Sequence, residues 1–128
     1  MADEITLTVS AEITKNNLKL FFRPGTITPD MSNSVHDNIS KSCTGTTTAA
    51  IYTVSNAASN GYAFFRNLST VTSVTSDNII FGNGTTPFCM LQAGEVALMR
   101  VAYEPTSTTV KTGASNETVS YQVMFLSP

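Results

Sequence analysis

The side chains that could carry out chemistry are few and widely spaced. His36 is the only histidine, and it stands beside Asp37 in a stretch without periodicity. Nucleophilic catalysis by a Ser/His/Asp or Cys/His set needs a base held against the nucleophile, whereas a lone loop histidine is more typical of a solvated surface. The sequence contains no Gly-x-Ser-x-Gly, Walker or dinucleotide-binding motif. It therefore predicts no catalytic residues and no enzymatic activity.

The potential metal ligands also lack the spacing that a metal site requires. Cys43, Cys89 and His36 are three scattered ligands, and a structural zinc site needs four. No acidic residue falls in an EF-hand calcium loop, and the separation of two carboxylates in a glycosidase pair cannot be inferred from sequence. We expect no metal and no cofactor. Buried free thiols are the favoured state of the two cysteines, with a disulfide as the alternative if the fold brings them together.

The charge and hydropathy of the chain argue against nucleic acids and membranes as partners. The chain has 128 residues, a formal net charge of −2 and an isoelectric point of about 5.2, and its seven basic residues are scattered. A nucleic-acid binder needs clustered lysine and arginine, so no nucleic-acid partner is expected. No apolar run is long enough to span a membrane, and the first residues lack the pattern of a secretion signal. We expect synthesis in a cytoplasm and no membrane partner.

The pattern along the chain is that of short strands. The sequence holds 20 Thr and 14 Ser, a composition that favours strands and turns. Strict alternation predicts a half-buried strand over Glu4 to Ile13, and a turn at Lys15 to Asn17 leads to a second strand over 18–22. Further strands are predicted over 46–54, 62–68, 71–75, 78–81, 88–92, 95–103, 110–114 and 119–125.

These elements predict an all-β fold for a single domain over residues 1–128. Eight to ten short, regularly spaced strands with essentially no helix are typical of an antiparallel β-sandwich, jelly-roll-like in form. One long irregular loop is expected at about residues 23–41. The segment from Glu95 to Tyr103 is apolar on both faces apart from Glu95 and Arg100, which places it at the centre of a sheet or in a subunit contact. Val110 to Ala114 is expected to be an edge strand.

The sequence gives little support for a catalytic, metal-binding or nucleic-acid-binding function. Self-assembly, or docking on another protein through the surface, is the function class that remains. The doubly apolar strand exceeds what a small sandwich needs to fill its core, and the irregular loop could lie across a neighbour. A structural or interaction protein is therefore the preferred interpretation. A carbohydrate-binding module is the alternative, although the chain has no tryptophan for an exposed aromatic platform.

Three segments in the second half of the chain carry a family resemblance. The segment Gly61 to Leu68 (GYAFFRNL), the tripeptide Ile80-Phe81-Gly82 and the segment Leu91 to Val101 (LQAGEVALMRV) resemble small β-sandwich proteins of tailed bacteriophages. The similarity extends over roughly Gly61 to Leu126. It implies a virion component without catalytic residues: a capsid decoration (cement) protein, or a small part of the tail or head-fibre apparatus, often trimeric.

The resemblance assigns hypothetical roles to two sets of residues. The expected subunit interface comprises Phe64, Arg66, Val96, Leu98, Arg100, Val101 and Tyr103. The expected shell-docking loop comprises Arg23, Pro24, Pro29, Met31 and His36. The implied partners are further copies of the chain, with a homotrimer favoured, and the major capsid protein or other virion proteins. The implied location is the virion. A carbohydrate- or receptor-binding module of a phage tail or head fibre is the alternative function.

Overall fold

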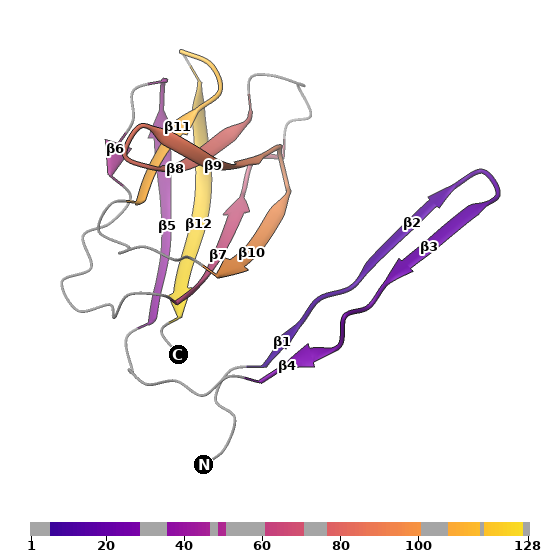
Figure 1. The fold of residues 1–128 in the computed structure, drawn as a ribbon. Helices are drawn as coiled ribbons and strands as arrows, with labels where there is room; N and C mark the ends of the chain where they lie inside the picture. The colour runs from indigo at the N-terminus through magenta and orange to yellow at the C-terminus, as the bar shows by residue number, and fades with distance from the viewer. Residues whose placement is uncertain are drawn as a thin grey trace. The chain divides into compact units, whose positions relative to one another are not determined.

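The computed structural model describes residues 6–28, 36–46, 49–50, 61–70, 77–100, 108–115 and 117–126. Contacts divide the chain into two compact units, Met1–Ser32 with Pro128 and Asn33–Ser127. The predicted all-β class is confirmed, because the described residues form twelve strands and no helix (Figure 1). The sandwich lies within the second unit, whereas the sequence suggested one sandwich domain over residues 1–128.

The first unit is a long antiparallel ribbon, which we call the arm and define as residues 6–28. It contains β1 (Leu7–Thr8), β2 (Ala11–Lys15), β3 (Leu18–Phe22) and β4 (Thr26–Ile27). Strand β2 pairs with β3, and β1 pairs with β4. The turn between β2 and β3 includes Asn16 with a φ of 54°, a left-handed conformation that asparagine tolerates better than most residues. The predicted turn and second strand are confirmed.

The second unit contains eight strands in two four-stranded antiparallel sheets. The strands are β5 (His36–Thr44), β6 (Ala49–Ala50), β7 (Tyr62–Asn67), β8 (Ile79–Asn83), β9 (Thr86–Leu91), β10 (Val96–Arg100), β11 (Thr108–Thr112) and β12 (Thr118–Leu126). The first sheet has the order β10-β7-β12-β5, and the second has the order β6-β11-β8-β9.

The connectivity of these eight strands is that of a jelly roll. The first strand pairs with the last, the second with the seventh, the third with the sixth and the fourth with the fifth: β5 with β12, β6 with β11, β7 with β10 and β8 with β9. The successive pairs alternate between the two sheets. This is an eight-stranded hairpin folded over into two layers, and it confirms the jelly-roll-like sandwich expected from the strand spacing.

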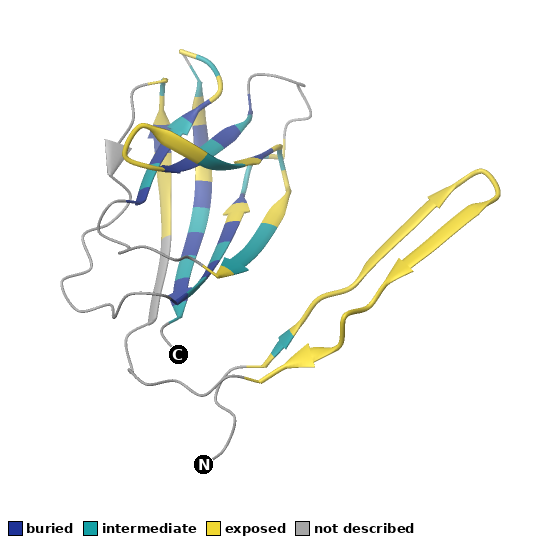
Figure 2. Ribbon diagram, viewed as in Figure 1, coloured by how far each residue is buried: buried dark blue, intermediate teal, exposed yellow. Residues whose placement is uncertain are grey.

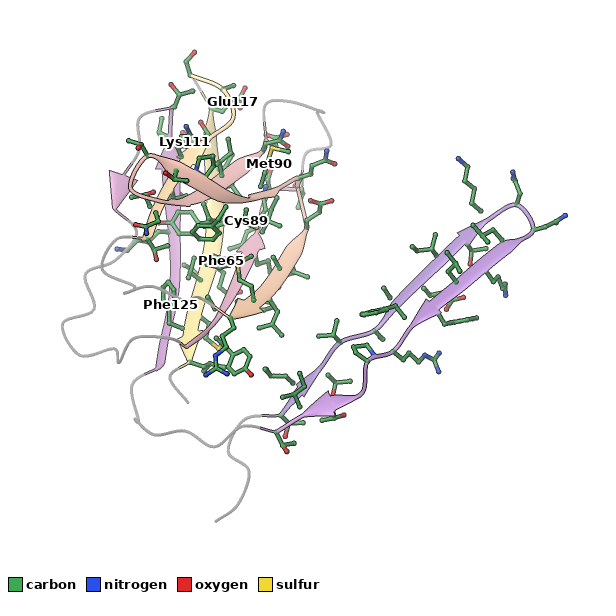
Figure 3. All side chains as sticks on the ribbon, in the orientation of Figure 1. Phe65, Cys89, Met90, Lys111, Glu117 and Phe125 are labelled. Carbon is green, nitrogen blue, oxygen red and sulfur yellow. The ribbon has the colours of Figure 1, made fainter. Side chains whose placement is uncertain are left out.

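Aromatic rings from both sheets meet in the core. Phe65 on β7 and Phe81 on β8 are fully buried, and their ring centroids lie 4.6 Å apart. Phe81 also contacts Tyr121 on β12 edge to face at 5.9 Å, and Phe65 contacts Phe125 in the same way at 6.1 Å. The buried stripes of the sandwich strands appear dark blue in Figure 2, and Figure 3 shows Phe65 among the interior side chains. Burial of such rings is the main stabilising contribution to the sandwich.

Buried polar groups tie one end of the core together. Asn67 is fully buried at the end of β7, and its side-chain amide donates to the carbonyl oxygens of Asp77 at 2.6 Å and Leu91 at 3.1 Å. Its Oδ1 accepts a hydrogen bond from the backbone N–H of Ser69 at 2.9 Å. The amide therefore replaces hydrogen bonds that these backbone groups would otherwise make with water.

Several sequence predictions about individual elements were wrong. The expected irregular loop at 23–41 contains β4 and the first six residues of β5, while residues 29–35 lie outside the described part. The strand predicted over Glu4 to Ile13 is described from residue 6 onward, where it is divided into β1 and β2. Apart from half-buried Leu7, its described residues are exposed, with Ile13 at 55%. Among the described strands, β10 is at the edge of its sheet, so the central position is wrong and the alternative, a subunit contact, stays a prediction. Strand β11 is an inner strand and not an edge.

Other predicted elements gave mixed outcomes. The strands predicted near 62–68, 78–81, 88–92 and 119–125 are confirmed as β7, β8, β9 and β12. The strand predicted over 46–54 is described only at Thr46, which is in a bend, and at β6. The strand predicted over 71–75 lies outside the described residues.

Candidate interaction surfaces

The first sheet leaves one face outside the core. Along β7, Ala63, Phe65 and Asn67 point inward and are buried, so alternation directs the residues between them outward. On β10, Ala97 and Met99 pack against the core, and their neighbours lie on the outer face. We call the resulting set the outer sheet patch: Tyr62, Phe64, Arg66, Val96, Leu98, Arg100, Gln122, Met124 and Leu126.

Register aligns this patch into rows across three strands. Leu98, Phe64 and Met124 are direct partners on β10, β7 and β12. They form an apolar row, and the neighbouring rows each contain an arginine. One row holds Val96, Arg66 and Gln122, and the other holds Arg100, Tyr62 and Leu126. The Arg100 guanidinium lies 5.4 Å from the centroid of the Tyr62 ring, within the range of a cation–π interaction. The patch is thus an apolar stripe between two cations.

Five of the seven predicted subunit-interface residues are brought together on this face: Phe64, Arg66, Val96, Leu98 and Arg100. Val101 and Tyr103 lie outside the described residues. Sequence reasoning missed Tyr62, Met124 and Leu126, although their alternation with Ala63, Val123 and Phe125 was a usable signal. Coverage of this face by another subunit stays a prediction.

The predicted docking-loop residues are divided between the two units and the part of the chain that the structure does not describe. Arg23 and Pro24 are exposed on the arm, and the Arg23 guanidinium lies 5.3 Å from the centroid of the Phe21 ring. His36 begins β5 in the other unit, so it is not a loop residue. Pro29 and Met31 lie outside the described residues. The shell-docking role of all five stays a prediction.

The arm has two different faces because directly paired residues project to the same side of a ribbon. Three pairs form one face: Ala11 with Phe22, Ile13 with Leu20, and Lys15 with Leu18. We call this the apolar arm face, since only Lys15 near the turn is charged. The pairs Glu12 with Phe21 and Thr14 with Lys19 form the opposite, mixed face.

No residue of the arm is buried. Leu7 is half-buried, and every other residue from 6 to 28 is exposed, as the yellow ribbon of β1 to β4 shows (Figure 2). Phe22 is 62% exposed and Leu20 is 52% exposed. Side chains project from both sides of the β2–β3 ribbon (Figure 3). A two-stranded ribbon is marginally stable in water at best, so the arm as described lacks the burial that would hold it.

The two cysteines are free thiols, and Glu95 makes a hydrogen bond with the backbone. Cys43 is buried, Cys89 is half-buried, and both are free thiols as favoured from the sequence. Burial raises the pKa of both thiols, and Glu95 raises the pKa of Cys89 further. A Glu95 carboxylate oxygen accepts a hydrogen bond from the backbone N–H of Gln92 at 2.8 Å. This hydrogen bond satisfies a backbone donor in the turn before β10.

One concave feature of the second unit is an open hollow of about 360 Å³ beside β8 and β9. Its lining residues are Ile80, Pro87, Phe88, Cys89 and Met90, and none of them is charged. Among the described residues, no group of three or more His, Cys, Asp or Glu side chains could hold a metal ion. Within the same part of the chain, no helix is long and apolar enough to cross a membrane.

Comparison with known proteins finds no matching family model, no matching curated protein and no matching solved structure. The resemblance to phage β-sandwich proteins therefore stays a prediction. The surfaces have to be interpreted from their own chemistry.

Proposed function

We propose that this chain is a non-enzymatic virion structural protein of a bacteriophage, most specifically a capsid decoration (cement) protein that acts by self-association and by docking on the shell. The observation that carries the proposal is the arm. Its aromatic and aliphatic side chains from Val9 to Ile27 are exposed, and none of the residues of the arm, 6–28, is buried. A segment of this kind gains stability when another surface covers it.

The sandwich supports the same function from a second side. Its core is filled by side chains from the inner faces of the two sheets, and the outer sheet patch lies on the other face of the first sheet. That patch is available for a contact with a neighbour, and a particle with many copies would multiply contacts that are individually weak. Jelly rolls also serve as capsid and lectin domains, but fold analogy alone does not assign a function.

Binding of the full chain to phage particles tests this proposal. Immunogold labelling should place the protein on particle heads, and the purified chain should co-sediment with particles that lack it. Phe22→Asp should lower the amount bound at least tenfold, because it puts a charge on the apolar arm face. Thr14→Asp, on the mixed face, is the matched control and should bind as the unaltered chain does. Absence of the protein from particles, with no co-sedimentation, would refute the proposal.

A further inference from the structure

The apolar arm face needs an occupant, and its own residues point to one. Ile13, Leu18, Leu20 and Phe22 are between 51% and 62% exposed, and they lie on one side of the β2–β3 ribbon. We infer that this face packs against the same face of a second copy of the chain, with the two ribbons antiparallel. The inference rests on the proposed self-association and names the contact that produces it.

The arrangement follows from the order of the rows. Face-to-face packing about a twofold axis that crosses the strands places β2 of one copy on β2 of the other, running in opposite directions. The central row, Ile13 with Leu20, then packs on its own copy. Each end row packs on the other end row, so Lys15 lies opposite Ala11 and Leu18 lies opposite Phe22. Alanine is the smallest residue on the face and leaves room for the lysine stem.

Charge separates this orientation from the parallel one. The only cation of the face, Lys15, is at one end. In the antiparallel stack the two Lys15 residues are separated by about 13 Å along the strands and about 10 Å between the layers, which exceeds the screening length of about 8 Å. In a parallel stack both lysines would share one row, with like charges beside an apolar contact. The antiparallel stack also brings each ammonium group toward the partner's Phe22 row.

Charge also disfavours the sandwich of another copy as the occupant. The outer sheet patch offers an apolar row of suitable shape, but Arg66 and Arg100 stand in the rows on either side of it. If the arm's strands ran along those of the patch with the central rows matched, the Lys15 row would lie over a row that contains an arginine in either direction. The arm of a second copy presents a cation at only one end, and that end can be matched with the uncharged row.

The area involved predicts a weak contact. Each half-exposed large side chain contributes on the order of 100 Å², so the four from each copy bury roughly 800 Å² together. Stable specific interfaces bury at least about 1,200 Å². Pairing through the arms alone should therefore be reversible in dilute solution and effective where copies are held near one another.

Sedimentation equilibrium of the full chain between about 10 μM and 1 mM tests the contact. We expect reversible dimers, with Leu20→Asp raising the dimer Kd at least tenfold and Thr14→Asp changing it less than twofold. Unchanged urea unfolding of the sandwich shows that both variants are folded. A chain that stays monomeric throughout this range, or equal weakening by both variants, would overturn the inference. A monomer would also result if the arm packed on the sandwich of its own chain, and this outcome too would overturn the inference.

Cross-linking tests the orientation. In a Cys43→Ala, Cys89→Ala background, Ile13→Cys should form dimers with a short bis-maleimide linker, because this residue lies opposite itself. Leu18→Cys should give at least tenfold less dimer, because its copies lie at opposite ends of the stack. Comparable yields from both variants would indicate a parallel stack and would contradict the inference.

The outcomes distinguish this inference from the proposed function. A chain that binds particles but forms no arm-dependent dimer would overturn the inference and leave the proposed function supported. A chain that dimerises through its arms but is absent from particles would do the reverse.

Discussion

The arm and the sandwich use similar residues with opposite results. Phe65 in the sandwich is fully buried, whereas Phe22 in the arm is 62% exposed. Both residues are in antiparallel strands with alternating patterns. The sandwich has two sheets that cover each other, whereas the described residues of the arm's unit form one ribbon without a second layer. Alternation therefore defines a face, and a second layer decides whether that face becomes a core. The sandwich contains its second layer, and we propose that another copy supplies it for the arm.

The largest expected difference comes from truncating one phenylalanine in each unit. Phe65→Ala should destabilise the sandwich by about 3–5 kcal/mol, because it opens a cavity between the two sheets. Phe22→Ala should change sandwich stability by less than about 0.5 kcal/mol in dilute protein. Urea unfolding followed by tyrosine fluorescence measures both. Similar losses would mean that the arm belongs to the same cooperative unit as the sandwich.

A second comparison concerns polar side chains. Asn67→Leu removes hydrogen bonds to two carbonyl oxygens and from one N–H in the interior, and should cost about 2–3 kcal/mol. Thr14→Val on the exposed arm should cost less than about 0.5 kcal/mol. The free energies of unfolding of the two variants test this difference. An Asn67→Leu protein as stable as the parent would show that the amide network contributes nothing.

A smaller loss of stability, confined to the sandwich, should appear in alkaline solution. Burial, with a contribution from Cys43, raises the pKa of Tyr121 from 10.0 to about 12. The folded state thus holds this proton more tightly than the unfolded state, so stability is complete below pH 10 and falls as the pH rises to 12. The loss should be on the order of 2 kcal/mol.

Tyr121→Phe provides the control for this effect. Stability measured by urea unfolding at several pH values between 9 and 12 should fall less steeply in the variant, because its buried ring has no hydroxyl to ionise. Identical slopes for the parent and the variant would contradict the assignment. The arm contains no tyrosine and should not contribute.

Sequence alone predicted the strands with strong alternation. In β12, Val119, Tyr121, Val123 and Phe125 alternate with less buried residues, and all four are buried as that pattern indicates. In β2 and β3 the same type of pattern predicted strands correctly but could not reveal that no layer within the described unit covers them. Burial depends on a partner surface, which a local pattern does not contain.

Strand β5 was missed for a physical reason. Its sequence, HDNISKSCT, is mostly polar, and its described side chains are exposed except for Cys43. It is an edge strand, paired with β12 on one side, and polar residues are typical of such edges because they discourage aggregation. The alternating pattern that predicts pairing is found in its partner, β12. Val119 of β12 lies opposite Cys43, and Val123 lies opposite Ile39.

Strand β10 shows how one signal can support two interpretations. Its two apolar faces suggested a central strand or a subunit contact. The structure assigns Ala97 and Met99 to the core and leaves Val96 and Leu98 on the outer sheet patch. The sequence of β10 indicates that its outer face is apolar. It does not indicate that Tyr62, Met124 and Leu126 extend this face, because their alignment depends on the register between segments that are distant in the sequence.

Amide hydrogen exchange of the full chain at low and high protein concentration tests most directly whether the arm, unlike the sandwich, depends on a second copy. Amides of β7, β8, β11 and β12 should be protected equally at about 1 μM and 1 mM, because their free energy of opening depends on the sandwich alone. Amides of β2 and β3 should exchange near the rate of an unstructured peptide at the low concentration and become protected at the high one. Strong protection of the arm that is independent of concentration would contradict this account.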